Sequence, residues 1–257
     1  MLKKFLLEDE IEGLHNSSSI LSNNNSSSPS VPLLISLDHV SIYSELDNSP
    51  ILKDISFEVV PGKLTVIIGP VGSGKSSVLL GILNELPIDP ISNGSIRVNG
   101  KLIYSSQEAW IFSGTVRDNI LFGREFDPVR YREVVKVAAL SKDFQQFDDG
   151  DQIQVDDRGT SLSGGQRARI SLARALYTNA DCYLLDDPLS AVDASVARHI
   201  FEKCIKEYLK NKCVILVTHQ LQFIKQADQI VVLKDGSCLA CGSYMELLNK
   251  GKIFLVF

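Results

Sequence analysis

The sequence predicts an α/β fold built on a mainly parallel β-sheet, and three observations lead to that prediction. Short apolar runs rich in β-branched residues, of which Leu64–Ile68 is the clearest, have the composition of parallel strands buried on both faces. Stretches with apolar residues at helical spacing, such as 127–140, alternate with these runs along the chain. Of the 257 residues, 44% are hydrophobic and 22% are charged, which is the balance of an ordinary globular domain.

The elements are expected in a definite order along the chain. Alternating apolar and polar residues predict half-buried strands at 35–40 and 55–59. The dipeptide Asn99-Gly100 follows the predicted strand Ser95–Val98 and has the composition of a hairpin turn. The other predicted strands are 64–68, 182–186, 214–217 and 230–233, and the predicted helices are 127–140, 166–177 and 193–209.

The composition divides the chain into two parts. Residues 16–30 include twelve Ser or Asn residues out of fifteen, so they hold too little apolar surface to offset the entropy of ordering. With a short amphipathic stretch at 2–12, they predict a disordered linker over 1–32. Residues 33–257 are expected to form the folded domain.

Charge and cysteine content exclude several classes of protein. The net charge of −5 disfavours nucleic-acid binding through bulk charge, and no run of about 18 apolar residues is present to span a bilayer. Five cysteines, an odd number, argue against a disulfide scaffold and for a reducing compartment. Cys238 and Cys241 form a CxxC pair, but strand alternation would place the two thiols on opposite faces, which disfavours metal binding.

A glycine-rich loop carries the strongest functional signal. The segment from Gly69 to Ser76 fits the pattern G-x-x-x-x-G-K-[ST] at every required position, directly after a predicted strand. Glycines let backbone N–H groups approach phosphate oxygens, and the helix that follows presents its positive end. Lys75 can reach the β- and γ-phosphates, and the Ser76 hydroxyl can bind Mg²⁺. The loop therefore predicts a site for nucleotide phosphates.

Two carboxylates end a later apolar strand. Asp186 closes the run Cys182–Asp186, and Asp187 follows it. Ligands bind at the carboxyl ends of parallel strands, so Asp186 is expected to hold Mg²⁺ through water. Asp187 is expected to face the terminal phosphate, where a base can orient an attacking water.

A second glycine motif opens the predicted helix 166–177. Leu162-Ser-Gly-Gly-Gln166 places free N–H groups and a hydroxyl at a helix start, which is a second anion site. Because one chain needs only one cradle for a terminal phosphate, this motif suggests a nucleotide held by another subunit. Taken alone, the turn is explained equally well as a flexible helix cap.

Together these residues resemble the ATP-binding-cassette family over about 33–251. The resemblance rests on the phosphate loop, the LSGGQ signature and the Asp186 strand, with Gln107, the loop from Ser190 to Asp193, and His219 in matching order. The stretches 69–77, 109–123 and 185–193 are similar to the first nucleotide-binding domain of subfamily C, the multidrug-resistance-associated group. This implies a P-loop NTPase core with an antiparallel β subdomain and an α-helical subdomain at about 112–159.

The resemblance also implies roles for individual residues. Tyr43 would stack on adenine, His219 would contact the γ-phosphate, and Gln107 would touch Mg²⁺ and sense the membrane domain. Asp187, His219 and Gln107 would form the catalytic group, and Asp193 would communicate across a dimer. The implied nucleotide-binding residues are Tyr43, Gly69, Val71, Gly72, Ser73, Gly74, Lys75, Ser76 and Ser77; the Mg²⁺ residues are Ser76, Gln107 and Asp186; and the signature residues are Leu162, Ser163, Gly164, Gly165 and Gln166.

The implied function is that of an ATP-binding domain of a membrane exporter, with ATP and Mg²⁺ as cofactors. Its partners would be a second nucleotide-binding domain and the transmembrane domains of the same transporter. It would lie on the cytoplasmic face of a membrane, associated only through those domains.

Two departures from the family pattern bear on activity. The family usually has Glu where this chain has Asp187, and one methylene less withdraws the carboxylate by roughly 1.5 Å, which can cost on the order of 10²-fold in rate. The resemblance therefore implies weak hydrolysis at this chain's own site and an intact signature for the partner's site. The segment 155–159 lacks the usual Gly-Glu pair, so contacts to the membrane domain are less defined.

Two other functions stay open at this stage. A non-hydrolysing, nucleotide-gated regulatory domain of a channel or channel regulator would have the same motifs. A soluble cassette ATPase of DNA repair or translation is disfavoured, because only 87 positions separate Ser76 from Ser163, without the long coiled coils of proteins that handle DNA ends.

Overall fold

The computed structural model describes residues 34–44, 47, 49–89, 92–156, 159 and 161–252. The predicted linker over 1–32 lies outside the described residues, as do Asp157 and Arg158 of the segment before the signature. Across the described ranges, no helix combines the length and apolar character needed to cross a membrane.

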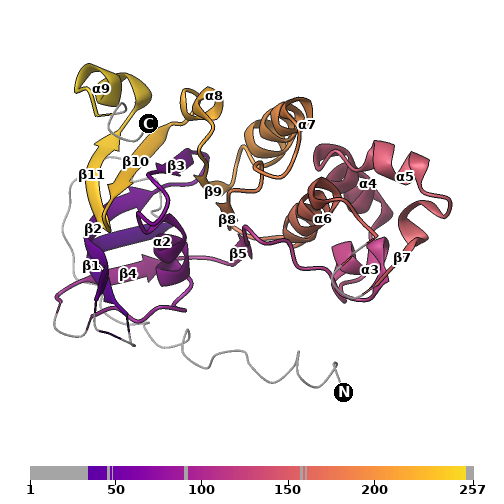
Figure 1. The fold of residues 1–257 in the computed structure, drawn as a ribbon, viewed down its shortest axis with the longest axis horizontal. Helices are drawn as coiled ribbons and strands as arrows, with labels where there is room; N and C mark the ends of the chain where they lie inside the picture. Colours follow the sequence, from indigo (N-terminus) through magenta and orange to yellow (C-terminus); the bar gives the residue numbers. More distant parts are fainter. Residues whose placement is uncertain are drawn as a thin grey trace, which may run out of the picture. The chain divides into compact units, whose positions relative to one another are not determined.

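A nine-stranded sheet forms the centre of the described domain, in the order β4-β1-β2-β11-β10-β3-β9-β8-β5 (Figure 1). Neighbours from β10 through β3, β9 and β8 to β5 all run parallel, whereas β1 pairs antiparallel with β2 and β4. The prediction of an α/β fold with a mainly parallel sheet is confirmed. The strands are β1 Ile35–Tyr43, β2 Pro50–Val59, β3 Leu64–Ile68, β4 Ser95–Val98, β5 Leu102–Ser105, β8 Cys182–Asp186, β9 Cys213–Val217, β10 Gln229–Lys234 and β11 Ser237–Gly242, with a separate pair of β6 Gly114–Thr115 and β7 Gln154–Val155.

Strand β3 shows why the central runs are mainly apolar. Val66 and Ile68 belong to one buried cluster, and Ile67 belongs to another, so successive side chains enter cores on opposite faces of the sheet. Helix α2 packs into the second cluster through Val78 and Leu79. A strand covered on both faces buries every side chain, so β3 is almost entirely apolar, and the hydroxyl of its one polar residue, Thr65, donates a hydrogen bond to Gln229 Oε1 at 3.0 Å.

The turn at Asn99-Gly100 is not a hairpin, so that prediction is wrong. Strand β4 pairs with β1 at one end of the sheet, and β5 pairs with β8 at the other end. The Asn99 N–H donates to the Leu34 carbonyl oxygen at 2.8 Å, and Gly100 has φ +113° beside Asp181. The two residues therefore change the direction of the chain as it leaves one end of the sheet for the other.

Most helices begin at a residue that caps them. Asp127 precedes α4 and accepts hydrogen bonds from the N–H groups of Val129 and Arg130, and Asp193 caps α7 in the same way. The predicted helix 193–209 changes geometry partway, since it continues beyond His199 as a π-helical segment, Ile200–Tyr208. The helices are α2 Lys75–Ile82, α3 Val116–Leu121, α4 Pro128–Val137, α5 Ser141–Gln146, α6 Gly164–Tyr177, α7 Ala194–His199, α8 Leu221–Ile224 and α9 Tyr244–Asn249, with a 3₁₀ turn at Gly150–Gln152.

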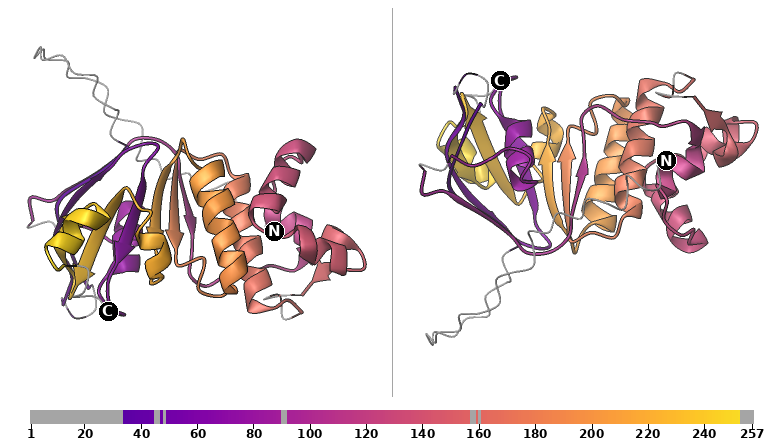
Figure 2. Two further views of the ribbon diagram at one scale, coloured as in Figure 1. Left: turned by 90° about the horizontal axis from the view of Figure 1, so that it is seen from above. Right: turned by 90° about the horizontal axis from the view of Figure 1, so that it is seen from below.

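The helices of 112–159 gather beyond the β5 end of the sheet. Figure 2 shows helix α6 and the helix that follows Asp193 between the parallel strands and these helices. Arg174 of α6 holds the junction: its guanidinium donates to the Asn119 carbonyl oxygen at 2.7 Å and lies 5.2 Å from the ring centre of Trp110. Burial lowers the pKa of Arg174 to about 10.

Candidate nucleotide site

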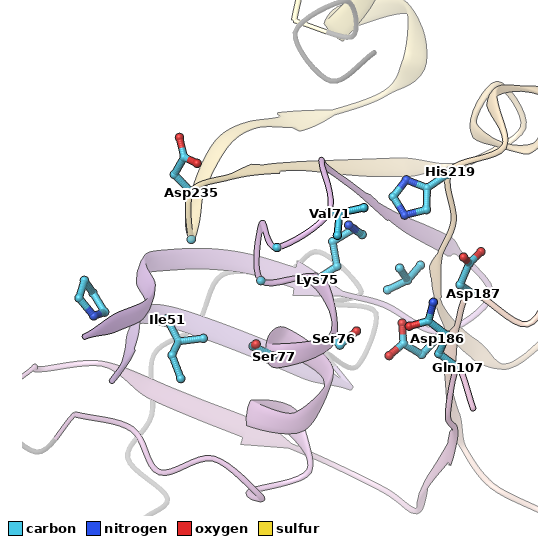
Figure 3. A pocket seen from close by; sticks show the side chains of 15 residues that line it. Ile51, Val71, Lys75, Ser76, Ser77, Gln107, Asp186, Asp187, His219 and Asp235 are labelled. Atoms are coloured by element: carbon cyan, nitrogen blue, oxygen red, sulfur yellow. The ribbon is translucent and has the colours of Figure 1, made fainter. Parts of the chain in front are cut away.

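A pocket of about 530 Å³ lies at the carboxyl ends of the parallel strands, where α/β sheets bind ligands. Figure 3 shows Gln107, Asp186, Asp187 and His219 on one side of Lys75, with Ile51 and Asp235 on the other. The structure thus brings together side chains from the ends of β5, β8 and β9 with the loop that follows β3. The lining residues are Pro50, Ile51, Val71, Gly72, Gly74, Lys75, Ser76, Ser77, Gln107, Asp186, Asp187, Val217, His219, Asp235 and Gly236.

The loop between β3 and α2 depends on glycine at defined positions. A Cβ on Gly69 would lie 2.4 Å from the Leu233 carbonyl oxygen and 2.4 Å from Ser73 Oγ, so no side chain fits there. Gly74 has φ +94°, and a Cβ on it would approach Leu52 to 2.7 Å. These glycines let the loop turn tightly and deliver the chain into α2.

Helix α2 begins at Lys75 directly above this loop. Lys75 is only 8% exposed, and its ammonium group donates to the carbonyl oxygens of Gly69 at 2.9 Å and Pro70 at 2.7 Å. Burial lowers the pKa of Lys75, and the nearby Asp186 and Asp187 act in the opposite direction. The first turn of α2 carries no acidic residue, so the positive end of the helix dipole is not neutralised there.

Asp186 ends β8 almost entirely inside the protein. The residue is 2% exposed, and its Oδ2 accepts a hydrogen bond from the Tyr104 hydroxyl at 3.1 Å. Burial, with the negative charge of Asp186 beside it, raises the pKa of Tyr104, so this phenol stays protonated and acts as a donor.

Asp187 occupies an unusual backbone conformation one residue further along. Its φ is +47°, in the left-handed region, and its N–H donates to the Val217 carbonyl oxygen at 3.1 Å. The residue is 8% exposed, and burial raises the pKa of its carboxyl group, while the neighbouring His219 lowers it. His219 is itself exposed, in the loop after β9.

The chemistry of the site fits a nucleotide and Mg²⁺. Ser73 Oγ is buried without a hydrogen-bond partner among the described residues, and Gly72 leaves open space where a Cβ would stand. A hydroxyl from Ser76 and a carboxylate from Asp186 line one pocket, and these oxygen ligands are the kind that Mg²⁺ prefers. Ser76, Gln107 and Asp186 are thus the residues available to hold the metal.

The signature residues stand at the start of α6 and do not line this pocket. Ser163 Oγ accepts from the Gln166 N–H at 3.2 Å, and Gln166 Oε1 accepts from the Ser163 N–H at 2.9 Å, which forms a capping box. Gln166 Nε2 also donates to Asp143 of α5 at 3.0 Å. Leu162 is buried, while a Cβ on Gly164 would enter open space.

Four further predicted residues also stand outside the pocket lining. Gly69 and Ser73 are buried beneath it. Tyr43 is 37% exposed at the end of β1, opposite Pro50, which does line the pocket. Asp193 caps α7, and hydrogen bonds from Val196 and Ser195 hold the pKa of its carboxyl group below the usual range.

Sequence reasoning missed one wall of the pocket. Pro50 and Ile51 open β2, and Asp235 and Gly236 form the turn between β10 and β11. The Gly236 N–H donates to the Ser73 carbonyl oxygen at 3.3 Å, so this turn contacts the phosphate loop directly. The Asp-Gly pair is a turn signal in the sequence, but nothing local indicates which loop it meets.

Comparison with known proteins agrees with the motifs. A family described as ABC transporter matches residues 52–190. ATP-binding cassette sub-family C member 4 of Homo sapiens is 52% identical over 214 residues, which are 83% of this chain and 16% of that protein. The probable multidrug resistance-associated protein lethal(2)03659 of Drosophila melanogaster is 53% identical over 208 residues, 80% of this chain and 15% of that protein. The chain therefore spans about one-sixth of the length of these relatives.

Proposed function

The chain belongs to the ABC transporter family, as a nucleotide-binding domain of subfamily C, and on this basis we propose that it binds Mg·ATP as part of a membrane exporter. The observation that carries the proposal is the convergence of Lys75, Ser76 and Asp186 in one pocket at the strand ends. Its partners would be the transmembrane domains and a second nucleotide-binding domain, at the cytoplasmic face of a membrane.

Each residue of the pocket has a distinct task in this proposal. The loop N–H groups and Lys75 bind the phosphates, and Ser76, Gln107 and Asp186 hold the metal, which supplies neutralisation of phosphate charge when bound. His219 donates a hydrogen bond toward the terminal phosphate, and Asp187 orients water. Tyr43 provides a ring for the adenine from the end of β1.

The signature at the start of α6 serves the partner's site. Its Ser163, Gly164 and Gly165 are at the surface or close to it and do not line the pocket of their own chain. In a head-to-tail sandwich, these residues complete the site that holds the partner's ATP, and Asp193 lies where the two domains communicate. ATP binding closes the sandwich, and hydrolysis, chiefly at the partner's site, reopens it.

Weak hydrolysis at the chain's own site follows from Asp187. The carboxylate is one methylene shorter than that of Glu, so it is withdrawn from the attacking water, and a misplacement on that scale can cost on the order of 10²-fold in rate. The same observation favours a second candidate function, a non-hydrolysing, nucleotide-gated regulatory domain of a channel or channel regulator.

Calorimetric titration of the 257-residue chain with Mg·ATP tests the proposal. Wild type should bind, Lys75→Met should lose most of the affinity, and Lys225→Met, which removes an exposed lysine outside the pocket, should bind like wild type. If wild type gave no heat of binding, no change in fluorescence and no protection by the nucleotide when Mg·ATP was added, the proposed function would be rejected.

A turnover assay separates the two candidate functions. The chain alone should hydrolyse ATP slowly, and Asp187→Glu should raise turnover once a partner nucleotide-binding domain is present. Rapid turnover by the isolated wild-type chain would contradict the weak site. Whether the assembled protein moves solute or gates a pore then distinguishes an exporter from a regulator.

A further inference from the structure

Tyr104 connects two strands that meet at the pocket. It lies on β5, and its hydroxyl donates to Asp186 Oδ2 at the end of β8, 82 positions later in the chain. The parallel register pairs Tyr104 with Leu184, which is two residues before Asp186. Residues two apart share a face of a strand, so the phenol reaches along that face to the carboxylate.

The surroundings make this hydrogen bond consequential for Asp186. Asp186 is 2% exposed, and the Tyr104 hydroxyl is the hydrogen-bond donor that the described residues supply to its carboxylate. A buried carboxylate without a donor carries a large desolvation cost and is free to turn about its side-chain torsions. A neutral phenol restrains it without introducing a positive charge that would compete with a cation.

We propose that Tyr104 is a positioning residue for divalent metal, which holds Asp186 through Oδ2 and leaves Oδ1 available as a ligand. The proposal rests on the function assigned above, because Asp186 is the metal-binding carboxylate there. Partners of metal ligands commonly fix the orientation of the ligand, and their loss typically costs 10- to 100-fold in metal affinity.

The position of Tyr104 also couples Asp186 to the Gln107 loop. Tyr104 precedes Gln107 by three residues, and β5 ends at Ser105 between them. A displacement of this strand end would therefore move the Gln107 loop and the donor to Asp186 together. Gln107 and Asp186 line the same pocket, so both potential metal ligands are set by one strand.

Tyr104→Phe removes only the hydroxyl and is the direct test. Binding of ATP to the full 257-residue chain is measured with Mg²⁺ and again with EDTA, and Mn²⁺ affinity in the presence of ATP is followed by electron paramagnetic resonance. We expect Mn²⁺ and Mg²⁺ affinity to fall about tenfold. ATP affinity in EDTA should stay within about twofold of wild type, because the phosphate loop is untouched.

Tyr183→Phe is the matched control. Tyr183 lies on β8 itself, is 1% exposed, and donates its hydroxyl hydrogen bond to the Thr178 carbonyl oxygen at 2.9 Å, away from the pocket. This variant also loses one phenol hydroxyl, here from the strand that carries Asp186, so it should lose stability without a change in metal dependence. Tyr104→Phe placed on Asp186→Asn should add little to the loss of metal affinity, because both act on one ligand.

The outcomes are separable. Equal metal affinity in wild type and Tyr104→Phe, or an equal loss of ATP binding with and without metal, would overturn the positioning role. Failure of wild type to bind Mg·ATP would instead reject the proposed function. If Tyr104→Phe does not fold, 3-fluorotyrosine at position 104 keeps the hydroxyl, and its ¹⁹F resonance should shift when Mg²⁺ is added with ATP; the absence of a shift larger than that of the same label at Tyr183 would overturn the proposal.

Discussion

Asp187 combines an uncommon backbone conformation with the burial of an ionisable side chain. Its φ of +47° is uncommon for a residue with a side chain, and its carboxyl group is nearly buried. Local strain of this kind persists where the surrounding structure holds it, here through the bonds to Val217 and Ser190. Strain concentrated at this position is consistent with a site selected for function over stability.

The first prediction concerns the pH dependence of stability at Asp187. Since burial raises its pKa in the folded state, folding is favoured while the group is protonated, and that advantage is lost as pH rises from the unfolded pKa through the folded one. Asp187→Asn should therefore stabilise the domain at pH 7 by about 1 kcal/mol. Urea denaturation should show the gain shrinking as pH is lowered toward 4.

Asp193→Asn is the control of opposite sign. Hydrogen bonds lower the pKa of Asp193, so its charge stabilises the folded state at neutral pH, and that contribution is lost as pH falls through the folded pKa. The substitution should reduce stability at pH 7, although Asn remains an acceptable helix cap. A less stable Asp187→Asn at pH 7 would contradict the account of that site.

At the scale of elements, α6 is fixed firmly at its start. The capping box at Ser163 fixes its first turn, and Asp143 of α5 pairs with Arg169 one turn further on at 2.6 Å. Both side chains of that pair are about one-tenth exposed, so the pair is far better shielded than a surface ion pair. The signature is thus presented on a helix whose position relative to α5 is defined.

The second prediction compares two capping boxes of the same kind. Ser163→Ala removes the box at α6, and Ser243→Ala removes the box formed with Glu246 at α9. Each should cost about 1 kcal/mol in the free energy of unfolding. Only Ser163→Ala should also reduce turnover of the assembled transporter, because only that hydroxyl faces the partner's nucleotide in the proposed sandwich. Equal turnover in the two variants would contradict the role of the signature.

Elements with a local cause were predictable from sequence. The strand Leu64–Ile68 and the starts of the helices predicted over 127–140 and 193–209 are set by nearby residues, and the structure places these elements close to the predicted positions, with Asp127 and Asp193 as the capping residues. Asn99-Gly100 has the composition of a hairpin turn, but β4 pairs with β1 and β5 pairs with β8, both of which are distant in the sequence. Local composition therefore predicted the wrong pairing at this turn.

Strand β11 shows the same limit. A β-bulge leaves Leu239 without a partner in the pairing with β10. The bulge interrupts the alternation of side chains between Cys238 and Cys241, so the argument that alternation puts their thiols on opposite faces does not apply. Bulges are set by the neighbouring strand rather than by local composition. The pocket also has a part that local sequence predicts and a part that it does not. The residues of the phosphate loop and of the Asp186 strand were recognised from motifs. The Asp235-Gly236 wall and the Tyr104 hydrogen bond depend on packing between distant segments.

At the scale of the molecule, Gly236 joins three parts of the domain. Its N–H donates to Ser73 in the phosphate loop, and its carbonyl oxygen accepts from the Lys53 N–H of β2 at 2.8 Å. It has φ +78°, and a Cβ on it would stand 2.4 Å from the Ile51 carbonyl oxygen. The turn between β10 and β11 is therefore a brace between the antiparallel strands and the nucleotide site.

The third prediction tests this brace with two glycines of similar backbone geometry. Gly236→Ala should destabilise the domain by about 2–4 kcal/mol and weaken Mg·ATP binding roughly tenfold, because both the backbone and the Ile51 contact must shift. Gly123→Ala has φ +77° but open space around a Cβ, so it should cost about 1 kcal/mol and leave binding unchanged. Denaturation and calorimetry measure both; similar losses in the two variants would remove the case for the brace.

The position of β3 between β9 and β10 also constrains how the domain is made. The phosphate loop follows β3 early in the chain, yet both neighbours of β3 come more than 140 residues later. During synthesis, this apolar strand must wait unpaired while most of the domain is still being translated, a period in which association with other chains competes with folding. A ribosome-bound chain stalled before residue 213 should therefore be unable to retain nucleotide. We expect chaperones to bind the exposed apolar strand until β9 and β10 have been synthesised.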